Sequence, residues 1–256
     1  MKDANDWAEF SGDYNPIHFD LAWVQARGGN HLSVHGMRAL LDVKHFSSQQ
    51  FLQATFEADQ AIKCVIRIRY PLWNNVKYPL VAGNKLGSSA ILMTGGQKCI
   101  TCNLSSTDRT ALIQTQDTQY ICANDVLNMQ KTFDARFSKL PLWIFLDAIV
   151  FKHLIENENI LKGNHLTDWF PKNANLKDIF AHYSVVQTHQ EVQFDPIFLQ
   201  PDPFSGKSDA IKIGIQPEIV TGDIHSGLLV CIQIVAEYQH KLLSNSITLK
   251  ISSTHA

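Results

Sequence analysis

The stretch Leu140–Asn157, LPLWIFLDAIVFKHLIEN, restricts the fold of this chain more than any other segment. Its apolar side chains cover nearly the whole circumference of an α-helix, and they are Leu140, Trp143, Ile144, Phe145, Leu146, Ile149, Val150, Phe151, Leu154 and Ile155. A surface helix carries one apolar stripe, so a helix that is apolar all round has to be enclosed by other elements. Asp147, Lys152 and His153 interrupt the stretch, which is also shorter than the roughly 20 residues of a membrane span. We therefore expect a buried helix.

Both halves of the chain follow the order of a long helix and then strands. After Gly36 there is no glycine or proline up to about Phe56, and apolar residues recur at near-helical spacing, which predicts one long helix. Beyond Asp59 the period changes to two, so that Ile62, Cys64 and Ile66 share one strand face. Further strands are predicted at Ser89–Met93, Lys98–Leu104, Ala111–Cys122, Tyr183–Phe194, Ala210–Gln216, Leu228–Tyr238 and Ser246–Ser252.

These patterns predict an α+β fold in which antiparallel sheets enclose helices. An apolar helix followed by strands with one apolar face is satisfied when the sheet curls around the helix. The chain has 256 residues, which exceeds the roughly 100–150 of a common domain and favours two such units side by side. We place these units at residues 1–125 and 126–256. The boundary is expected between Ala123 and Lys139, where polar residues interrupt the apolar patterning.

Composition and charge exclude several classes of function. The net charge is −2 and no long basic block is present, so nucleic acid is not an expected partner. The segment Met1–Trp7 is polar without an apolar signal-peptide core, so we expect a cytoplasmic protein that does not enter a membrane. The five cysteines show no disulfide spacing, which suits a reducing compartment. Cys99 and Cys102 lie in a predicted strand and are expected to be plain thiols rather than a redox or metal pair.

Residues suited to proton transfer cluster in the segment FSGDYNPIHFD, Phe10–Asp20, which is followed by VHGM at Val34–Met37. Gly12 is expected to end a helix, and Pro16 excludes helix at its own position and favours an extended residue before it. Asp13 and His18 therefore flank a rigid turn that can direct a carboxyl group and an imidazole at one water molecule. Histidine suits this role because its ordinary pKa lies close to neutrality.

The two segments together resemble the signature of the MaoC-like, R-specific enoyl-CoA hydratases. In that family, a Gly-Asp-x-Asn-Pro-(Ile/Leu/Val)-His-x-(Asp/Asn) run precedes a His-Gly-Met at the start of the central helix. The matching positions here are Gly12, Asp13, Asn15, Pro16, Ile17, His18, Asp20, His35, Gly36 and Met37. The resemblance implies a double hotdog fold and reversible hydration of trans-2-enoyl thioesters, carried on coenzyme A or acyl carrier protein, to 3-hydroxyacyl thioesters of fatty acid metabolism. It implies no cofactor.

The resemblance makes Asp13 and His18 the catalytic pair, with the assignment of acid and base left open. Gly36 is expected to open the long helix, where free N–H groups and the positive end of the helix dipole can hold the thioester oxyanion. Asn15 and His35 are candidates for substrate positioning. Asp20 is expected to cap the following short helix, near Leu21–Ala26, rather than to act in catalysis.

The second half is expected to be catalytically silent. Its segment Thr221–His225 contains an aspartate and a histidine, but the histidine follows two positions after the aspartate instead of five, and no proline turn lies between them. The remaining histidines show no metal-ligand spacing, so no metal is expected. Arg67 and Arg69 either meet the phosphates of coenzyme A or form an ordinary solvated strand face.

Two other functions remain open on the sequence. The first is a hotdog thioesterase, which would direct water at the thioester carbon itself. The second is a non-catalytic acyl-binding protein that has kept the fold. Each is compatible with an assembly in which two double-hotdog chains form a homodimer. The Asp13-to-His18 spacing favours hydration or dehydration, because hotdog thioesterases usually lack this turn.

Overall fold

The computed structural model describes residues 2–57, 59–109, 118–157, 170, 175–201, 203–204, 208–216, 219–223 and 227–252. Within these residues, ten strands form one continuous antiparallel sheet. The strands are β1 (Gln60–Ile68), β2 (Leu80–Ala82), β3 (Ser88–Leu92), β4 (Lys98–Asp108), β5 (Thr118–Ile121), β6 (Ser184–Phe194), β7 (Ile211–Ile215), β8 (Ile219–Asp223), β9 (Gly227–Tyr238) and β10 (Lys241–Ser252). The helices are α1 (Lys2–Ser11), α2 (Leu21–Gln25), α3 (Gly36–Phe51), α4 (Ala123–Phe137), α5 (Leu142–Glu156) and α6 (Leu176–His182).

The sheet joins the two halves of the chain through its middle strands. Its order is β2-β3-β4-β1-β6-β10-β9-β7-β5, with β8 paired to β9. β1 and β6 run antiparallel and pair from Ile62 with Phe194 to Arg67 with His189. Because hydrogen bonds cross from one half to the other at this point, the two units share a single sheet.

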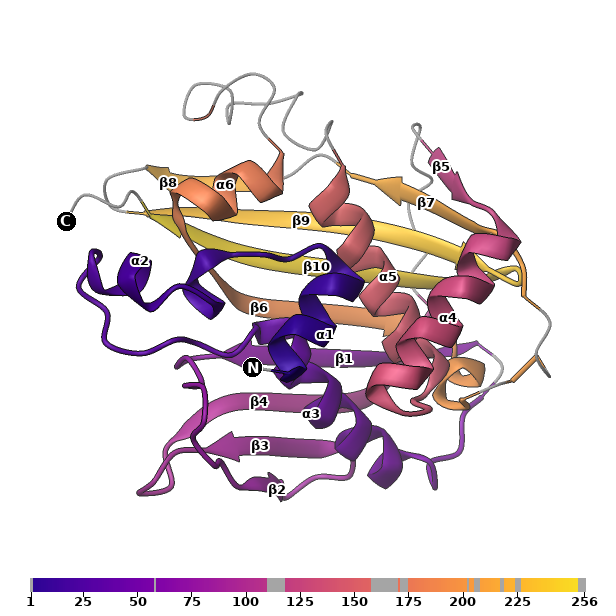
Figure 1. The fold of residues 1–256 in the computed structure, drawn as a ribbon. Coiled ribbons are helices and arrows are strands. Elements are labelled where there is room, and N and C mark those ends of the chain that lie inside the picture. The colour runs from indigo at the N-terminus through magenta and orange to yellow at the C-terminus, as the bar shows by residue number, and fades with distance from the viewer. Residues whose placement is uncertain are drawn as a thin grey trace.

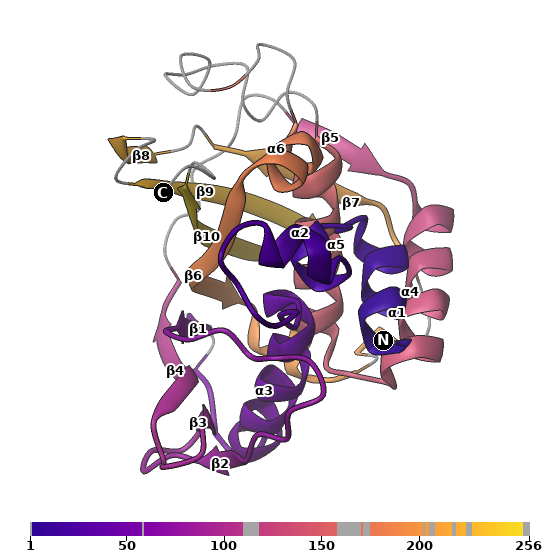
Figure 2. The same ribbon diagram turned by 60° about the vertical axis from the view of Figure 1, so that its left-hand side comes forward.

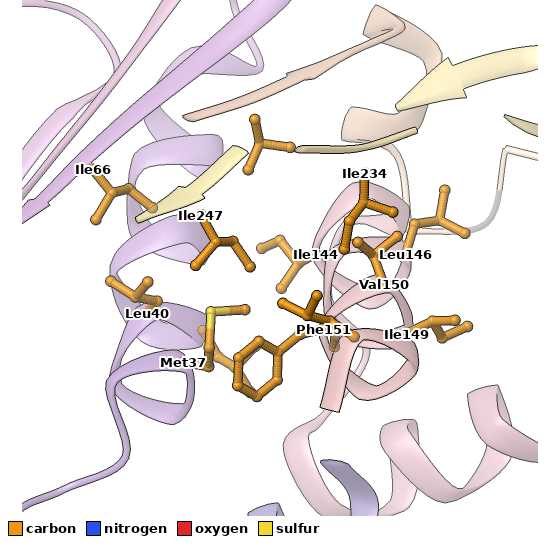
Figure 3. Close-up of a cluster of buried hydrophobic side chains, with 14 of the residues drawn as sticks. Met37, Leu40, Ile66, Ile144, Leu146, Ile149, Val150, Phe151, Ile234 and Ile247 are labelled. Atoms are coloured by element: carbon orange, nitrogen blue, oxygen red, sulfur yellow. The ribbon is translucent and has the colours of Figure 1, made fainter. Parts of the chain in front are cut away.

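The helices α3 and α5 lie side by side against this sheet, as Figure 1 and Figure 2 show. The side chains of α5 are buried on nearly every side, from Leu142 to Ile155. Figure 3 shows Met37 of α3 next to Phe151 of α5, with Ile144 of α5 and the strand residue Ile247 above them in the same cluster. The predicted arrangement of two long helices enclosed by antiparallel sheet is confirmed. α3 ends at Phe51, five residues before the predicted end at Phe56.

A helix occupies the segment that the sequence indicated as a break between the halves. α4 covers Ala123–Phe137 and packs against α1 and α5. Figure 2 shows α1 and α4 together as an outer layer beside α5. The apolar residues of α4, Val126, Met129 and Phe133, recur at helical spacing and face the core, and the polar residues between them form the exposed face. The division at residues 125 and 126 stays a prediction, and it falls within this helix.

An ion pair lies in the core between the two long helices. Asp147, which interrupts the apolar pattern of α5, accepts a hydrogen bond from Lys44 of α3, and both side chains are 0% exposed. The side-chain amides of Gln190 and Asn245 also donate to the Asp147 carboxylate. Burial raises the pKa of Asp147, and the Lys44 charge opposes that effect. A buried charge of this kind requires such partners, because it has lost its solvent.

Several smaller predictions have clear outcomes. The strand predicted at Ala111–Cys122 is described only as β5, because residues 110–117 lie outside the described residues. The strands predicted elsewhere correspond to β3, β4, β6, β7, β9 and β10, although β4 continues past Leu104 to Asp108 and β10 begins earlier, at Lys241. Cys99 and Cys102 are buried free thiols, as expected. No helix in the described part of the chain is both long and apolar enough to cross a membrane.

Candidate active site

The N-terminal helix α1 ends in a way that turns Asp13 toward the interior. Gly12 has a φ of +80°, a conformation that L side chains rarely adopt, and its N–H bonds back to the Ala8 carbonyl at 2.8 Å. The Ser11 hydroxyl donates to the Trp7 carbonyl and accepts from the Asp13 N–H. These hydrogen bonds at the end of α1 fix the main-chain position of Asp13.

The turn predicted around Pro16 is present and is held by its own side chains. The Asp13 carboxylate accepts from the Asn15 N–H at 3.2 Å, and the Asn15 side-chain oxygen accepts from the Ile17 N–H at 3.2 Å. Pro16 begins the short 3-10 helix η1 (Pro16–His18), which ends at His18. Two successive turns of this kind leave the segment little freedom, so Asp13 and His18 are presented on a rigid support.

Asp20 caps the next helix, as predicted. Its carboxylate accepts from the Trp23 N–H at 2.9 Å, and α2 begins at the following residue, Leu21. This side chain is exposed, unlike that of Asp13, which is 7% exposed. The two aspartates of the motif therefore have separate roles, one at a helix start and one in the interior.

The hydrogen bonds of His18 determine which ring nitrogen is free. Its Nδ1 lies 2.9 Å from the Ser33 carbonyl oxygen and 3.1 Å from the Ser33 hydroxyl. A carbonyl oxygen can only accept, so the neutral ring carries its hydrogen on Nδ1. The lone pair of His18 is then on Nε2, where it can accept a proton.

His35 supports both members of the predicted pair. Its Nε2 donates to the Asp13 carbonyl at 3.1 Å, and its ring stacks on the His18 ring with centroids 3.7 Å apart. His35 is also the N-cap residue of α3, but its side chain makes no capping hydrogen bond. The first N–H groups of α3, beginning with Gly36, therefore receive no side-chain cap from His35.

Burial shifts the pKa values of these groups in opposite directions. Desolvation raises the pKa of Asp13 to about 7, against a smaller lowering by the Asn15 N–H. Desolvation lowers the pKa of His18 to about 4 and that of His35 to about 2. Near neutrality, Asp13 is divided between its protonated and ionised forms while both histidines are neutral. The cluster can therefore present one proton donor beside one proton acceptor.

Gly36 lies against a residue of the second half. A Cβ atom at this position would stand 3.3 Å from Oε1 of Gln187 and 3.6 Å from Ile68, so a larger side chain has no free space here. Gln187 belongs to β6, and the sequence analysis did not identify it as a site residue. It lies in no motif, and only the contact between β6 and α3 brings it to the site.

Asp13, His18 and His35 also have the geometry to hold a divalent cation. Each offers one ligand atom, and these atoms lie within 4.8 Å of one another. Nδ1 of His18 and Nε2 of His35 already bond to main-chain carbonyls. A cation would consequently have to use the other nitrogen of each ring. The predicted absence of a metal stays a prediction.

The start of α5, the corresponding place in the second half, differs from the start of α3. The Leu142 N–H at its first position donates to the Gln200 carbonyl at 3.0 Å. Thr221 and Asp223 of the second, incomplete motif lie on β8, while Ile224 and His225 lie outside the described residues. Thr221 and Asp223 pair with Leu229 and Gly227 of β9, and β8 is not part of the main strand order of the sheet.

A cavity of about 100 Å³ lies elsewhere on the protein. Its lining includes Arg109 and Lys241, which both form ion pairs with Asp195, at 2.7 Å and 3.3 Å. These contacts lie where β6 ends and β10 begins, while Gln187 and Gly36 meet near the opposite end of β6. The cavity is therefore separate from the candidate active site. Arg69, an alternative phosphate ligand, is exposed and bonds to Thr101.

Known structures share this architecture. A protein described as a MaoC-domain dehydratase from Chloroflexus aurantiacus is similar, with a TM-score of 0.50 and 5% identity over 98% of this chain and 90% of that one. A hotdog-fold protein from Alicyclobacillus acidocaldarius has a TM-score of 0.43 and 11% identity over 93% and 90% of the two chains. Acyl-CoA thioesterase II TesB2 from Mycobacterium marinum has a TM-score of 0.44 and 10% identity over 87% of this chain and 92% of that one.

The chain has a double hotdog fold. Both helix-in-sheet units are present in one chain, and the similarity to solved structures extends over nearly its whole length. Neither a protein-family model nor a curated protein sequence matches the chain. At these identities the similarity concerns the fold, so the activity has to be argued from the site itself.

Proposed function

We propose that this double hotdog is a hydro-lyase that adds water reversibly to a trans-2-enoyl thioester and forms a 3-hydroxyacyl thioester. The observation that carries the proposal is the buried pair of Asp13 and His18, whose pKa values of about 7 and about 4 provide a donor and an acceptor at neutral pH. The carrier is coenzyme A or acyl carrier protein, and the compartment is the cytoplasm.

The hydrogen bonds of the pair suggest a division of roles for hydration. Nε2 of His18 accepts a proton from water while the water oxygen bonds to C3 of the substrate. The electrons of the C2–C3 double bond move toward the thioester, whose oxygen becomes an enolate oxyanion. Protonated Asp13 then delivers a proton to C2, and proton exchange through solvent returns His18 and Asp13 to their starting states. Dehydration follows the same steps in reverse.

The start of α3 supports this scheme at the developing negative charge. Its N–H groups are not capped by the His35 side chain, and they carry the positive end of the helix dipole. Gly36 has no side chain that would stand between the substrate oxygen and the main-chain N–H. Donors that are fixed before the reaction stabilise an oxyanion most effectively, because they need no reorganisation. Asn15 and His35 act here as positioning residues for the Asp13–His18 turn.

The differences between the halves support a single active half. At the start of α5 the Leu142 N–H is already bonded to Gln200, so the corresponding donor is engaged. The helix start is followed by the large buried side chains of Trp143 and Ile144. We propose that this half acts as the structural partner of the first and carries no Asp–His pair of its own.

The proposal is tested by hydration of short, medium and long trans-2-enoyl-CoA substrates, followed as loss of the conjugated thioester absorbance. Asp13→Asn and His18→Ala should each lower turnover by at least about a hundredfold, the lower scale for a positioned acid or base. The double variant should be scarcely slower than the poorer single variant, since both groups act on one water molecule. Exhaustive chelation should leave the activity intact.

Matched variants control for damage to the fold. Asp20→Asn alters the other aspartate of the motif but keeps a capping side chain, and His31→Ala removes an exposed histidine. Both should retain full turnover. Near-full turnover in Asp13→Asn or His18→Ala would refute the dyad. Release of free thiol without loss of the double bond would instead identify a thioesterase, and binding without turnover would identify an acyl-binding protein.

A further inference from the structure

Gln187 has a buried hydrogen-bond donor with no partner. Its Nε2 is inaccessible to solvent and makes no hydrogen bond to any described residue. The same amide lies over the start of α3, with its Oε1 3.3 Å from the place of a Cβ on Gly36. Leaving a buried donor unsatisfied costs about 1–3 kcal/mol, so such a group in a native protein calls for an explanation.

A bulge in β6 places Gln187 on this side of the sheet. β6 pairs with β10 in regular register up to His189 opposite Thr248, and Gln187 is then opposite Leu249, so Thr188 is an extra residue. Gln190, Val192 and Phe194 point inward on one side of the bulge, and Val185 points inward on the other. A strand without the extra residue would turn Gln187 outward, because side chains alternate between the two faces. β-bulges next to active sites commonly redirect a side chain in this way.

The neighbouring Gln190 shows how a structural glutamine is held in the same strand. Its Nε2 donates to Asp147 at 2.8 Å and to Asn245 at 3.2 Å, so its donors serve the buried ion pair between α3 and α5. Gln187 points toward the same helix, but its amide nitrogen has no comparable acceptor within the described residues. An apolar side chain would fill this position without an unsatisfied amide. The difference indicates that the acceptor for Gln187 is a ligand.

We propose that Nε2 of Gln187 donates a hydrogen bond to the carbonyl oxygen of the substrate thioester and completes the oxyanion hole begun by the Gly36 N–H. A carbonyl oxygen has two lone pairs and can accept from both donors at once. This inference rests on the proposed thioester chemistry. It gives the second half of the chain a catalytic residue, although we propose no Asp–His pair there. Because the oxygen becomes more negative in the transition state, this bond strengthens during the reaction.

The test uses two variants of the full-length protein. Gln187→Met keeps the length of the side chain and removes the donor. Gln187→Glu replaces the donor by a carboxyl group that can donate only when it is protonated. Gln216→Met is the matched control, because Nε2 of Gln216 is also buried without a partner among the described residues. Gln216 directly follows β7, which β10 and β9 separate from β6.

Turnover of the enoyl-CoA panel is measured first. Gln187→Met should lower kcat about a hundredfold, as loss of an oxyanion-hole donor does, with a smaller change in KM. Its melting temperature without ligand should be no lower than that of the unsubstituted protein, because the unsatisfied donor has been removed. The turnover of Gln187→Glu relative to the unsubstituted protein should rise as the pH falls and the new carboxyl group becomes protonated. Gln216→Met should keep full turnover. If Gln187→Met stayed within about threefold of the unsubstituted protein, the proposal for Gln187 would be overturned while hydration still stood.

A binding measurement separates this proposal from the proposed reaction. Affinity is compared for a saturated acyl-CoA and for the matching thioether, which lacks the carbonyl oxygen. The unsubstituted protein should bind the thioester more tightly, and Gln187→Met should lose that preference. If no enoyl thioester were hydrated but the preference were present and depended on Gln187, the hydratase assignment would fail and the carbonyl contact would stand. Equal binding of both ligands by the unsubstituted protein would overturn the contact.

Discussion

At the scale of single residues, one physical effect prepares both members of the candidate pair. Burial disfavours a charged form, so it raises the pKa of an acid and lowers that of a base. Asp13 and His18 are both inside the protein, and their pKa values have moved to about 7 and about 4. Between these two values the acid holds its proton and the base is free. A solvated pair would have the opposite order of pKa values.

This order predicts the pH dependence of hydration. The competent form has protonated Asp13 and neutral His18, so kcat/KM should be highest between pH about 4 and about 7. It should fall about tenfold per pH unit above that range as Asp13 ionises, and likewise below it as His18 is protonated. Initial rates in constant-ionic-strength buffers measure the profile. A plateau that extends unchanged to pH 9 would contradict the assignment of Asp13 as the acid.

The same burial predicts that Asp13 destabilises the protein at high pH. Its pKa is 3.8 ordinarily and about 7 in the fold, so the unfolded chain loses this proton first and stability falls as the pH rises through that interval. Asp13→Asn removes the ionisation and keeps an oxygen for the Asn15 N–H. Its melting temperature should exceed that of the unsubstituted protein at pH 8, by about 2–4 °C per kcal/mol recovered, and match it at pH 4. Equal melting temperatures at pH 8 would show that burial does not hold the proton on Asp13.

At the scale of elements, the contact between α3 and α5 combines apolar packing with one buried ion pair. Figure 3 shows the apolar part of this contact, and the Lys44–Asp147 pair lies in the same core. A second ion pair, between Lys63 and Glu191 at 2.6 Å, also crosses from one half to the other but is partly exposed. The two pairs differ mainly in solvation, which makes them suitable for comparison.

We predict that Lys44→Met destabilises the protein by about 3–5 kcal/mol, because it leaves the Asp147 carboxylate buried and unpaired. The double variant with Asp147→Leu should recover much of this loss, since no charge then remains in the core. Lys63→Met should cost less than about 1 kcal/mol, as expected for a partly exposed pair. Urea unfolding measures all three. The ion pair would be contradicted if Lys44→Met hardly lowered the free energy of unfolding and the double variant were no more stable than Lys44→Met alone.

At the scale of the whole molecule, the two hotdog units are not separate bodies. Their strands belong to one sheet, and β1 and β6 hydrogen-bond to each other at its centre. The outer helices α1 and α4 pack together as Figure 2 shows, and α4 itself spans the predicted boundary. The core is likewise shared, because α5 contacts both α1 and α3.

This continuity predicts that residues 1–125 and 126–256 do not fold when they are produced alone. Separation would expose the edges of β1 and β6, leave Lys44 and Asp147 without each other, and cut α4 near its start. Each fragment should lack a cooperative thermal transition by circular dichroism and should be inactive. Co-expression should restore both properties. A cooperative transition and full turnover in fragment 1–125 would show that the first unit is an independent enzyme.

The sequence by itself determined the features that depend on neighbouring residues. The apolar circumference of α5, the alternation in β1 and the turn around Pro16 are local patterns, and each one appears where it was predicted. The order of helices and strands was enough to predict two helices enclosed by antiparallel sheet, and the resemblance of Phe10–Asp20 and Val34–Met37 to a known signature implied the double hotdog. The helix α4 was not predicted from the sequence, because exposed helix residues and linker residues have similar compositions.

Only the tertiary structure decided which distant residues meet. Asp147 interrupts an apolar pattern in the sequence, and Lys44, with which it forms an ion pair, lies 103 residues away. Gln187 reaches Gly36 because a bulge changes the face of β6, and the bulge is defined by pairing with β10. The free nitrogen of His18 and the raised pKa of Asp13 likewise depend on the Ser33 carbonyl and on burial. Residue order specifies local geometry, whereas desolvation and long-range contacts exist only once the chain has folded.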